Sequence, residues 1–222
     1  MTSLFQRLKT DCADEWCSYT HHAFVRGMGD GSLPEAAFRD YLVQDYLFLI
    51  QFARAYALAT YKARSLSEMR AGLDGLKAIL DVEMDLHVRL CAKWGLSTVD
   101  LETTPEKPQT IAYTRFVLDA GQAGDLLDLY AALAPCMIGY GEIGKALQKH
   151  ATPDNPYAEW IAEYASDGYQ EIMAASIANL DALAVDMLTE NRYPRLKHLF
   201  SQATLLEADF WQMGLDAEQD EK

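Results

Sequence analysis

The feature that most constrains the fold of this chain is a helical spacing of apolar residues along almost its whole length. Apolar residues recur three and four positions apart, as on one face of an α-helix, and strict alternation never persists for the length of a strand. Half of the 222 residues are apolar, which is enough to bury a substantial core. The sequence therefore predicts an all-α, single-domain helical bundle.

Turn and cap residues place the ends of the first predicted helices. The glycine-rich segment 27–31 is expected to end the first helix. Ser32, with Glu35 three residues later, predicts a capping box that opens a long helix over residues 34–62. Pro34 then lies in the first turn, where a missing N–H is harmless.

The same signals divide the rest of the chain. Ser65 with Glu68 predicts a second capping box, for a helix that ends at Gly95. Residues 97–109 contain two prolines and are expected to form a surface loop. Further helices are predicted over residues 110–120, 125–149, 156–165, 168–189 and 194–215. No linker or repeat divides them, so we expect one domain over residues 1–215 and an acidic, frayed tail over residues 216–222.

The charge of the chain argues against several classes of partner. Nineteen Lys and Arg against 33 Asp and Glu give a net charge of −14, which repels a phosphate backbone or an anionic bilayer. The N-terminal residues lack the apolar run of a secretory signal, and no segment approaches the roughly 20 apolar residues of a membrane span. We therefore expect a cytoplasmic protein that binds neither nucleic acid nor membrane.

The four cysteines show no pattern of a zinc site or a disulfide framework. Cys12, Cys17, Cys91 and Cys136 include no C-x-x-C pair. The sequence predicts free thiols.

Two carboxylates fall on apolar faces of predicted helices. Asp45 shares a face with Phe38 and Leu42, and Glu207 lies in the apolar arc of the last helix. A buried carboxylate is costly unless a partner or a ligand meets it. One such residue is most often paired with a buried Arg or a helix N-terminus, whereas two of them near a thiol and tyrosines favour a site.

The helix predicted over residues 125–149 breaks local rules around a cysteine. Cys136 and Tyr140 lie one turn apart on its apolar stripe. Pro135 removes a helix hydrogen bond at a cost of about 3 kcal/mol, and each of three following glycines costs up to about 1 kcal/mol relative to Ala. Such breaks suit a ligand or a neighbouring backbone that approaches closely. The alternative is a buried cysteine that acts only as a small hydrophobe, and three aromatics at core-like positions would likewise be packing if taken alone: Tyr113, Tyr164 and Phe210.

Glu83 and His87 suggest a different kind of site, a metal site. They lie one turn apart on an apolar arc and could both ligate a metal ion. A di-iron bundle needs a Glu from two helices and Glu-x-x-His from two others. Glu-x-x-x-His occurs once here, so the pair is interpreted as a buried hydrogen-bonded couple, and no metal or other cofactor is predicted.

Five segments of the chain resemble, in order and spacing, the motifs of one known family. They are residues 22–25 with 29–34, residues 38–49, residues 134–140, residues 160–164 and residues 207–211. Together they resemble the TenA/THI-4 family, and Cys136 resembles the cysteine of its TenA-type thiaminase II branch. The resemblance implies a haem-oxygenase-like helical fold and a homotetramer.

The resemblance also implies a reaction and a set of site residues. The reaction releases 4-amino-5-hydroxymethyl-2-methylpyrimidine from 4-amino-5-aminomethyl-2-methylpyrimidine, from thiamin, or from both, in thiamin salvage. Cys136 would be the nucleophile and Glu207 the catalytic acid and base. The substrate-binding residues would be Asp45, Phe48, Tyr113, Tyr140, Tyr164 and Phe210. Phe48 stands where the best-known members have a tyrosine.

Three other functions remain open at this stage. One is a metal-dependent oxidase of the haem-oxygenase-like fold. Another is a pyrimidine- or thiamin-binding protein without catalytic activity. The third is a regulator that contacts DNA or a transcription factor, although the acidic charge argues against direct DNA contact.

Overall fold

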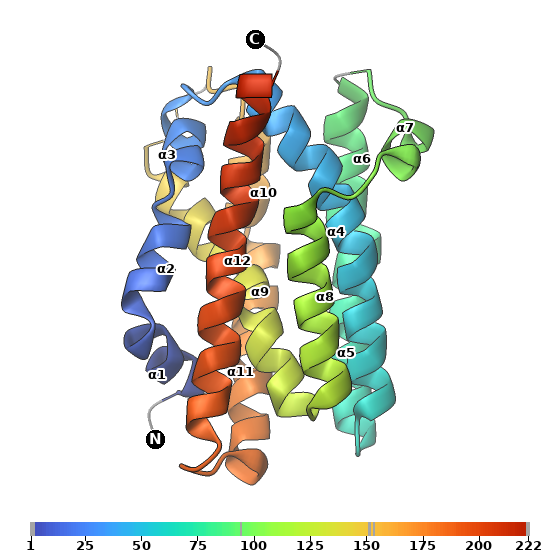
Figure 1. Ribbon diagram of the computed structural model, residues 1–222, viewed down its shortest axis with the longest axis vertical. Helices are drawn as coiled ribbons and strands as arrows, with labels where there is room; N and C mark the ends of the chain where they lie inside the picture. Colours follow the sequence, from blue (N-terminus) through green and yellow to red (C-terminus); the bar gives the residue numbers. More distant parts are fainter. Residues whose placement is uncertain (1–2, 94, 151, 153, 221–222) are drawn as a thin grey trace.

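The protein is all-α, as predicted. The computed structural model describes residues 3–93, 95–150, 152 and 154–220, and within these ranges it contains helices and turns but no strand (Figure 1). The helices are α1 (Leu4–Asp11), α2 (Ala13–Thr20), α3 (Ala23–Asp30), α4 (Glu35–Lys62), α5 (Leu66–Lys77), the π-helix η1 (Ala78–Glu83), α6 (Met84–Lys93), α7 (Thr98–Thr103), α8 (Pro108–Ala123), α9 (Leu126–Gln148), α10 (Ala158–Ala165), α11 (Asp167–Met187) and α12 (Tyr193–Asp220).

The bundle is organised around α9. This helix packs against α8, α10, α11 and α12, and the long helices α4, α8 and α12 run alongside one another (Figure 1). Every residue from Leu126 to Gly141 is buried. A helix surrounded in this way needs an apolar side chain on every face, which explains why α9 lacks a polar stripe.

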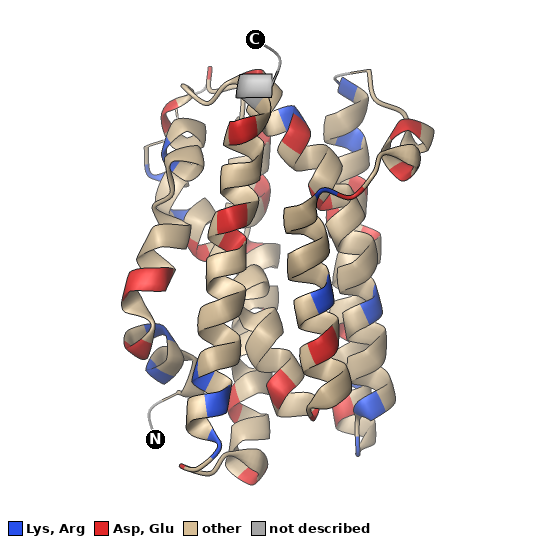
Figure 2. Cartoon of the chain, viewed as in Figure 1, with Lys and Arg blue, Asp and Glu red and all other residues tan. Residues whose placement is uncertain are grey.

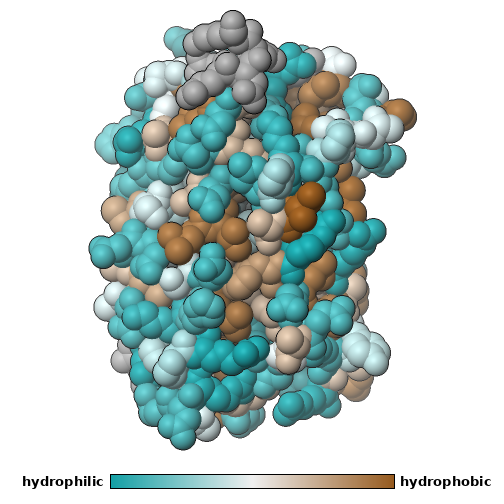
Figure 3. Space-filling view, viewed as in Figure 1, coloured by the Kyte–Doolittle hydropathy of each residue, from teal (hydrophilic) through white to brown (hydrophobic). Residues whose placement is uncertain are grey.

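The burial of α9 corrects the expectation that no segment is apolar enough for a membrane span. By length and composition, α9 meets that description, but 94% of its most apolar window is buried inside the bundle. The apolar composition of α9 is therefore explained by its place in the core of the bundle. Acidic and basic residues are scattered along the helices of the bundle (Figure 2). The surface in this view is mostly hydrophilic, interrupted by apolar patches (Figure 3).

The start of the chain differs from its prediction. The single first helix is three short ones, and α3 runs through Gly27 and Gly29 before Gly31, at a φ of 78°, ends it. The capping box at Ser32 does not form, because the Ser32 N–H donates to Asp30 and Pro34 precedes α4 without a side-chain cap. The long helix itself is confirmed at Glu35–Lys62.

The helix predicted after α4 begins and ends where the sequence indicated, but it is not one continuous α-helix. Ser65 caps α5, and at the far end Gly95 has a φ of 76°. The N–H groups of Gly95 and Leu96 donate to the carbonyls of Ala92 and Cys91, which is the Schellman pattern. Between these ends the helix is interrupted by η1, in which the Met84 N–H reaches back five residues to Ile79.

Two other predicted boundaries are wrong. The expected loop at 97–109 contains α7, because Ser97 and Asp100 cap its start reciprocally, and Pro108 already occupies the first turn of α8. The last helix runs past the expected end at Leu215 to Asp220. Residues 221 and 222 of the predicted tail lie outside the described residues.

Candidate active site

The inward carboxylate of α4, Asp45, is the centre of a buried hydrogen-bond chain. Its Oδ2 lies 2.5 Å from Nε2 of His87 on α6. The same oxygen accepts a hydrogen bond of 2.9 Å from the hydroxyl of Tyr41, one turn back on α4. Trp160 of α10 in turn donates its indole N–H to the Tyr41 oxygen at 3.2 Å. Three helices therefore converge on Asp45, and the expectation that this residue points inward is confirmed.

His87 is a member of this cluster that the sequence did not assign to it. Its Nδ1 lies 2.8 Å from the backbone carbonyl oxygen of Glu83. The predicted hydrogen bond between Glu83 and His87 therefore uses the main chain of Glu83 and not its carboxyl group. Burial lowers the pKa of His87, but the charge of Asp45 and its hydrogen bond raise it, and the net direction is upward. The signal in the sequence was a histidine on an apolar arc, without any indication of the partner on another helix.

Glu83 is the second residue that sequence reasoning left out of the site. It is the last residue of η1 and is buried. Burial raises the pKa of its carboxyl to about 8, and the nearby charge of Asp45 adds to the rise. Among the described residues, no group of three or more His, Cys, Asp and Glu side chains is arranged to hold a metal ion, so Glu83 and His87 lack the further ligands that the metal alternative needs.

Cys136 and Glu207 interact with each other, and the charge of Asp45 acts on both. Glu207 of α12 accepts a hydrogen bond of 2.8 Å from the hydroxyl of Tyr113 on α8. Burial raises the pKa of Glu207 to about 8, against the opposing effect of its hydrogen bonds with Tyr113 and Cys136. Burial also raises the pKa of the Cys136 thiol, and the charge of Glu207 raises it further. The thiol is therefore protonated at neutral pH, so its ionisation requires a proton acceptor.

The predicted ring contacts fill the space between these polar groups. The Phe48 ring lies 4.9 Å from that of Tyr113 and 5.6 Å from that of Phe210. The Tyr140 and Tyr164 rings lie 5.1 Å apart. All eight sequence-predicted site residues are buried, and these contacts join them with Tyr41 and His87 in one cluster, which we call the Cys–acid cluster.

The glycines around Cys136 have a packing explanation. A Cβ on Gly139 would lie 2.2 Å from the Tyr19 ring, and one on Gly144 would lie 2.6 Å from the backbone of Tyr164. The Tyr19 hydroxyl donates to the carbonyl of Pro135 at 3.4 Å. The sequence left open whether these glycines make room for a ligand or for a neighbouring part of the chain. The described residues support the second explanation, because α2 and α10 approach α9 closely at these glycines.

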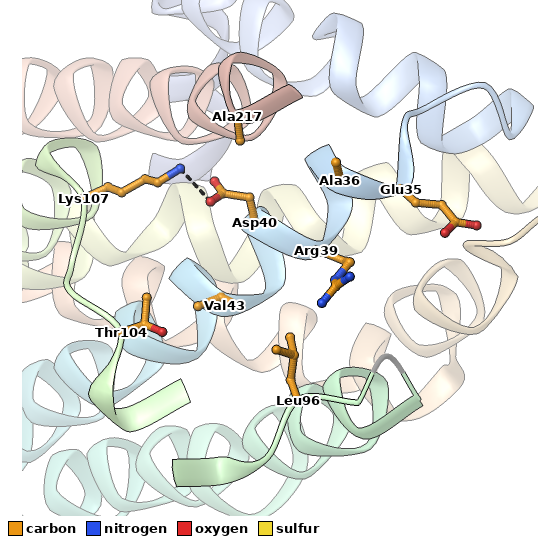
Figure 4. Close-up of a pocket in the computed structure, with 9 residues that line it drawn as sticks. All are labelled: Glu35, Ala36, Arg39, Asp40, Val43, Leu96, Thr104, Lys107 and Ala217. Carbon is orange, nitrogen blue, oxygen red and sulfur yellow. Dashed lines mark hydrogen bonds and ion pairs between the residues drawn. The ribbon is translucent and has the colours of Figure 1, made fainter. Parts of the chain in front are cut away.

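Two cavities among the described residues lie outside the Cys–acid cluster. A groove of about 570 Å³ at the start of α4 is lined by Arg39, the ion pair of Asp40 with Lys107, and Leu96 (Figure 4). A second cavity, of about 190 Å³, lies beside Tyr56 and Met137 between α4, α5, α9 and α11. The aromatic rings of the cluster pack against one another, so a flat ligand held between them requires side chains to shift.

Comparison with known proteins places this chain in one family. A sequence profile of the TENA/THI-4/PQQC family matches residues 11–217. An aminopyrimidine aminohydrolase from Halalkalibacterium halodurans is 40% identical over 201 residues, which cover 90% of this chain and 89% of that protein.

Solved structures agree with this placement. A structure described as a TenA family transcription regulator, from Silicibacter sp. TM1040, is 47% identical with a TM-score of 0.92 and covers 96% of each chain. A domain of unknown function with a heme oxygenase-like fold, from Shewanella denitrificans, has a TM-score of 0.74 at 14% identity over 97% of this chain and 93% of that one, which shows the fold alone.

The protein is thus a haem-oxygenase-like helical bundle with a thiol and carboxyl groups buried at its centre. The chain belongs to the TENA/THI-4/PQQC family, and the resemblance seen in its sequence motifs is confirmed.

Proposed function

We propose that this protein is an aminopyrimidine aminohydrolase of the thiaminase II type, which acts in thiamin salvage. The observation that carries the proposal is the pairing of Cys136 with Glu207 in one buried cluster with Asp45. Relatives from Halalkalibacterium halodurans and Bacillus subtilis that are named aminopyrimidine aminohydrolase support the substrate class.

The first chemical step transfers the thiol proton and forms a carbon–sulfur bond. Glu207 in its carboxylate form accepts the proton of Cys136, because a thiol in this environment does not ionise by itself. The thiolate adds to the ring carbon next to the one that bears the exocyclic methylene, and a ring nitrogen takes up a proton. The ring electrons then expel the leaving group from the methylene. An amine departs with the proton that Glu207 returns, whereas a thiazolium departs as the neutral thiazole, and the proton that Glu207 took from the thiol is then the one taken up by the ring nitrogen.

The second step adds water to the exocyclic alkene that remains. Glu207, again a carboxylate, removes a proton from water as the oxygen attacks the methylene carbon. The ring nitrogen releases its proton, and the carbon–sulfur bond breaks to restore the aromatic ring and the thiol. The net change is replacement of the amine or thiazole by a hydroxyl group, without oxidation or reduction.

The remaining residues of the Cys–acid cluster bind and orient the ring. Asp45 accepts hydrogen bonds from the aminopyrimidine edge, and Phe48, Tyr164 and Phe210 contact its faces. The acidic charge of the chain suits a substrate whose leaving group is cationic, as a thiazolium or an ammonium group is. It does not suit the DNA contact that a regulator would need.

Two properties implied by the family resemblance complete the proposal. The protein acts in the cytoplasm as a homotetramer. Apolar side chains exposed along one side of α5 are available for contacts between copies: Leu66, Met69 and Leu73. Sedimentation equilibrium should give four times the chain mass of 24.9 kDa, and a monomer mass would contradict the assembly.

The test of the proposed function is turnover of two substrates by wild type and by Cys136→Ser. We expect wild type to release the hydroxymethyl pyrimidine from the aminomethyl pyrimidine, from thiamin, or from both. Cys136→Ser should lose nearly all turnover while still binding the pyrimidine product. Cys12→Ser, at another buried thiol, serves as the matched control and should leave the rate unchanged. Binding by wild type without product release would favour the non-catalytic alternative.

A further inference from the structure

The hydrogen bonds of His87 determine where its ring hydrogens lie. Its Nδ1 is 2.8 Å from the backbone carbonyl oxygen of Glu83. Because a carbonyl oxygen only accepts, Nδ1 must carry a hydrogen. The other ring nitrogen, Nε2, lies 2.5 Å from Asp45 Oδ2, within the distance of an ion pair. His87 therefore forms a bridge from the end of η1 to the carboxyl group of α4.

A second chain of donors ends at the same carboxylate oxygen. The indole N–H of Trp160 can only donate, and it fills the acceptor side of the Tyr41 hydroxyl at 3.2 Å. The Tyr41 hydrogen is then directed to Asp45 Oδ2, at 2.9 Å. Oδ2 thus faces groups from two helices, Tyr41 on α4 and His87 on α6, and this arrangement fixes the orientation of the carboxyl group.

The two carboxyl oxygens of Asp45 consequently differ in their contacts. Oδ2 is occupied by His87 and Tyr41, whereas Oδ1 accepts no hydrogen bond from the described residues. Asp45 retains 4% of its surface exposed. Oδ1 is the acceptor that a bound heterocycle can reach without displacing a partner of the carboxylate.

We propose that His87 is a positioning residue that fixes the carboxyl group of Asp45 with Oδ1 presented to a hydrogen-bond donor of the substrate. This inference rests on the proposed function for its substrate, an aminopyrimidine with an amino group on the ring edge. His87 carries the compensating positive charge as an imidazolium, since both of its nitrogens face acceptors. The other acidic group beside it, Glu83, is neutral near pH 7 because burial raises its pKa to about 8.

The arrangement predicts that removal of the imidazolium weakens substrate binding more than the chemical steps. A charge-assisted hydrogen bond contributes about 1.5–3 kcal/mol, which corresponds to roughly a tenfold to hundredfold change in affinity. Glu207 keeps its own partner, the Tyr113 hydroxyl, when His87 is replaced. We therefore expect the effect in KM, with kcat changed by less than about threefold.

The first arm of the experiment compares His87→Gln with Cys91→Ala in the full-length protein. Gln keeps a neutral donor at this position but removes the charge, and Cys91 lies one turn further along α6, buried and outside the Asp45 chain. His87→Gln should raise KM for the aminomethyl pyrimidine by roughly tenfold or more. Cys91→Ala should change it by less than about twofold. Equal effects of the two variants would show that His87 acts only in packing.

The second arm measures the charge of His87 without reference to turnover. Nitrogen-15 NMR of the imidazole groups, assigned by difference against His87→Gln, should show both His87 nitrogens protonated near pH 7. In Asp45→Asn the same histidine should become neutral. A neutral His87 in wild type would overturn the inference, whereas absence of turnover with an imidazolium present would overturn only the proposed function.

Discussion

The hydroxyl of Tyr113 donates a buried hydrogen bond of 2.8 Å to Glu207, and this bond joins α8 to α12. It opposes the effect of burial, because a donor stabilises the ionised carboxylate while the apolar surroundings stabilise the neutral acid. The balance places the pKa of Glu207 at about 8. A group with a pKa near the working pH can both accept and return a proton, as the proposed reaction requires.

The first prediction concerns this balance. In Tyr113→Phe the pKa of Glu207 should rise above its value of about 8, because one stabilising donor is lost. The inflection of kcat/KM near that pH should move to higher pH. Tyr130→Phe, at a buried hydroxyl without a hydrogen-bond partner among the described residues, should leave the profile in place. An unmoved inflection in Tyr113→Phe would remove Glu207 from the pH dependence.

The second prediction links the same carboxyl to stability. Glu207 ionises near pH 8 in the folded protein and near its usual value of 4.5 when unfolded. Between these values the unfolded chain has lost the proton and the folded chain keeps it, so stability falls by about 1.4 kcal/mol for each rise of one pH unit.

Glu207→Gln cannot ionise, and its amide oxygen can still accept from Tyr113. The free energy of unfolding of this variant should therefore exceed that of wild type by an amount that grows from pH 5 to pH 8. Urea unfolding at four pH values in this range measures the difference. A difference that does not change with pH would contradict the raised pKa.

The third prediction tests the packing of Gly139. Because an added Cβ would lie 2.2 Å from the Tyr19 ring, Gly139→Ala should lower the free energy of unfolding by about 1–3 kcal/mol. At Gly141 the nearest atom is the flexible end of Met173, at 2.8 Å from a Cβ, and Ala gains helix propensity there. Gly141→Ala should thus be neutral or stabilising by thermal unfolding. Equal losses at both positions would mean that the helix tolerates no Cβ in this stretch.

The fourth prediction concerns Phe48, whose ring contacts Tyr113 and Phe210. Phe48→Tyr adds a hydroxyl donor to the Cys–acid cluster, and a donor that reaches the sulfur stabilises the thiolate. We expect kcat for the proposed reaction to rise while KM changes by less than about twofold. Phe52→Tyr, one turn further along α4, should leave kcat unchanged. A rise in both variants would indicate a general effect on the core.

The sequence predicted much of the site because burial leaves a periodic pattern. Asp45 and Glu207 stood among apolar residues at helical spacing, and the structure buries both. The partner of Asp45 was not predictable in the same way, since His87 belongs to another helix and one chain carries no signal for the contact. The π geometry of η1 was also missed, because a π-turn and an α-turn bury residues at similar spacings.

Only one of the wrongly predicted boundaries at α1, α2 and α7 has a local signal in the sequence. Ser97 with Asp100 has the spacing of a capping box, and it starts α7 within the predicted loop. The ends of α1 at Asp11 and of α2 at Thr20 have no glycine or proline beside them, so local sequence favours a longer helix there. Tertiary packing decides these two breaks.

The π-turn of η1 has a consequence for insertions and deletions. A π-helix holds one residue more than an α-helix over the same rise, so a deletion within residues 78–83 would allow the backbone to relax to α geometry. The residues C-terminal to η1 would then keep their orientation, and His87 would still face Asp45. A deletion of one residue at Met84 or Asp85, within the α-helical turn before His87, would instead rotate His87 by about 100° and break the bridge between the two helices.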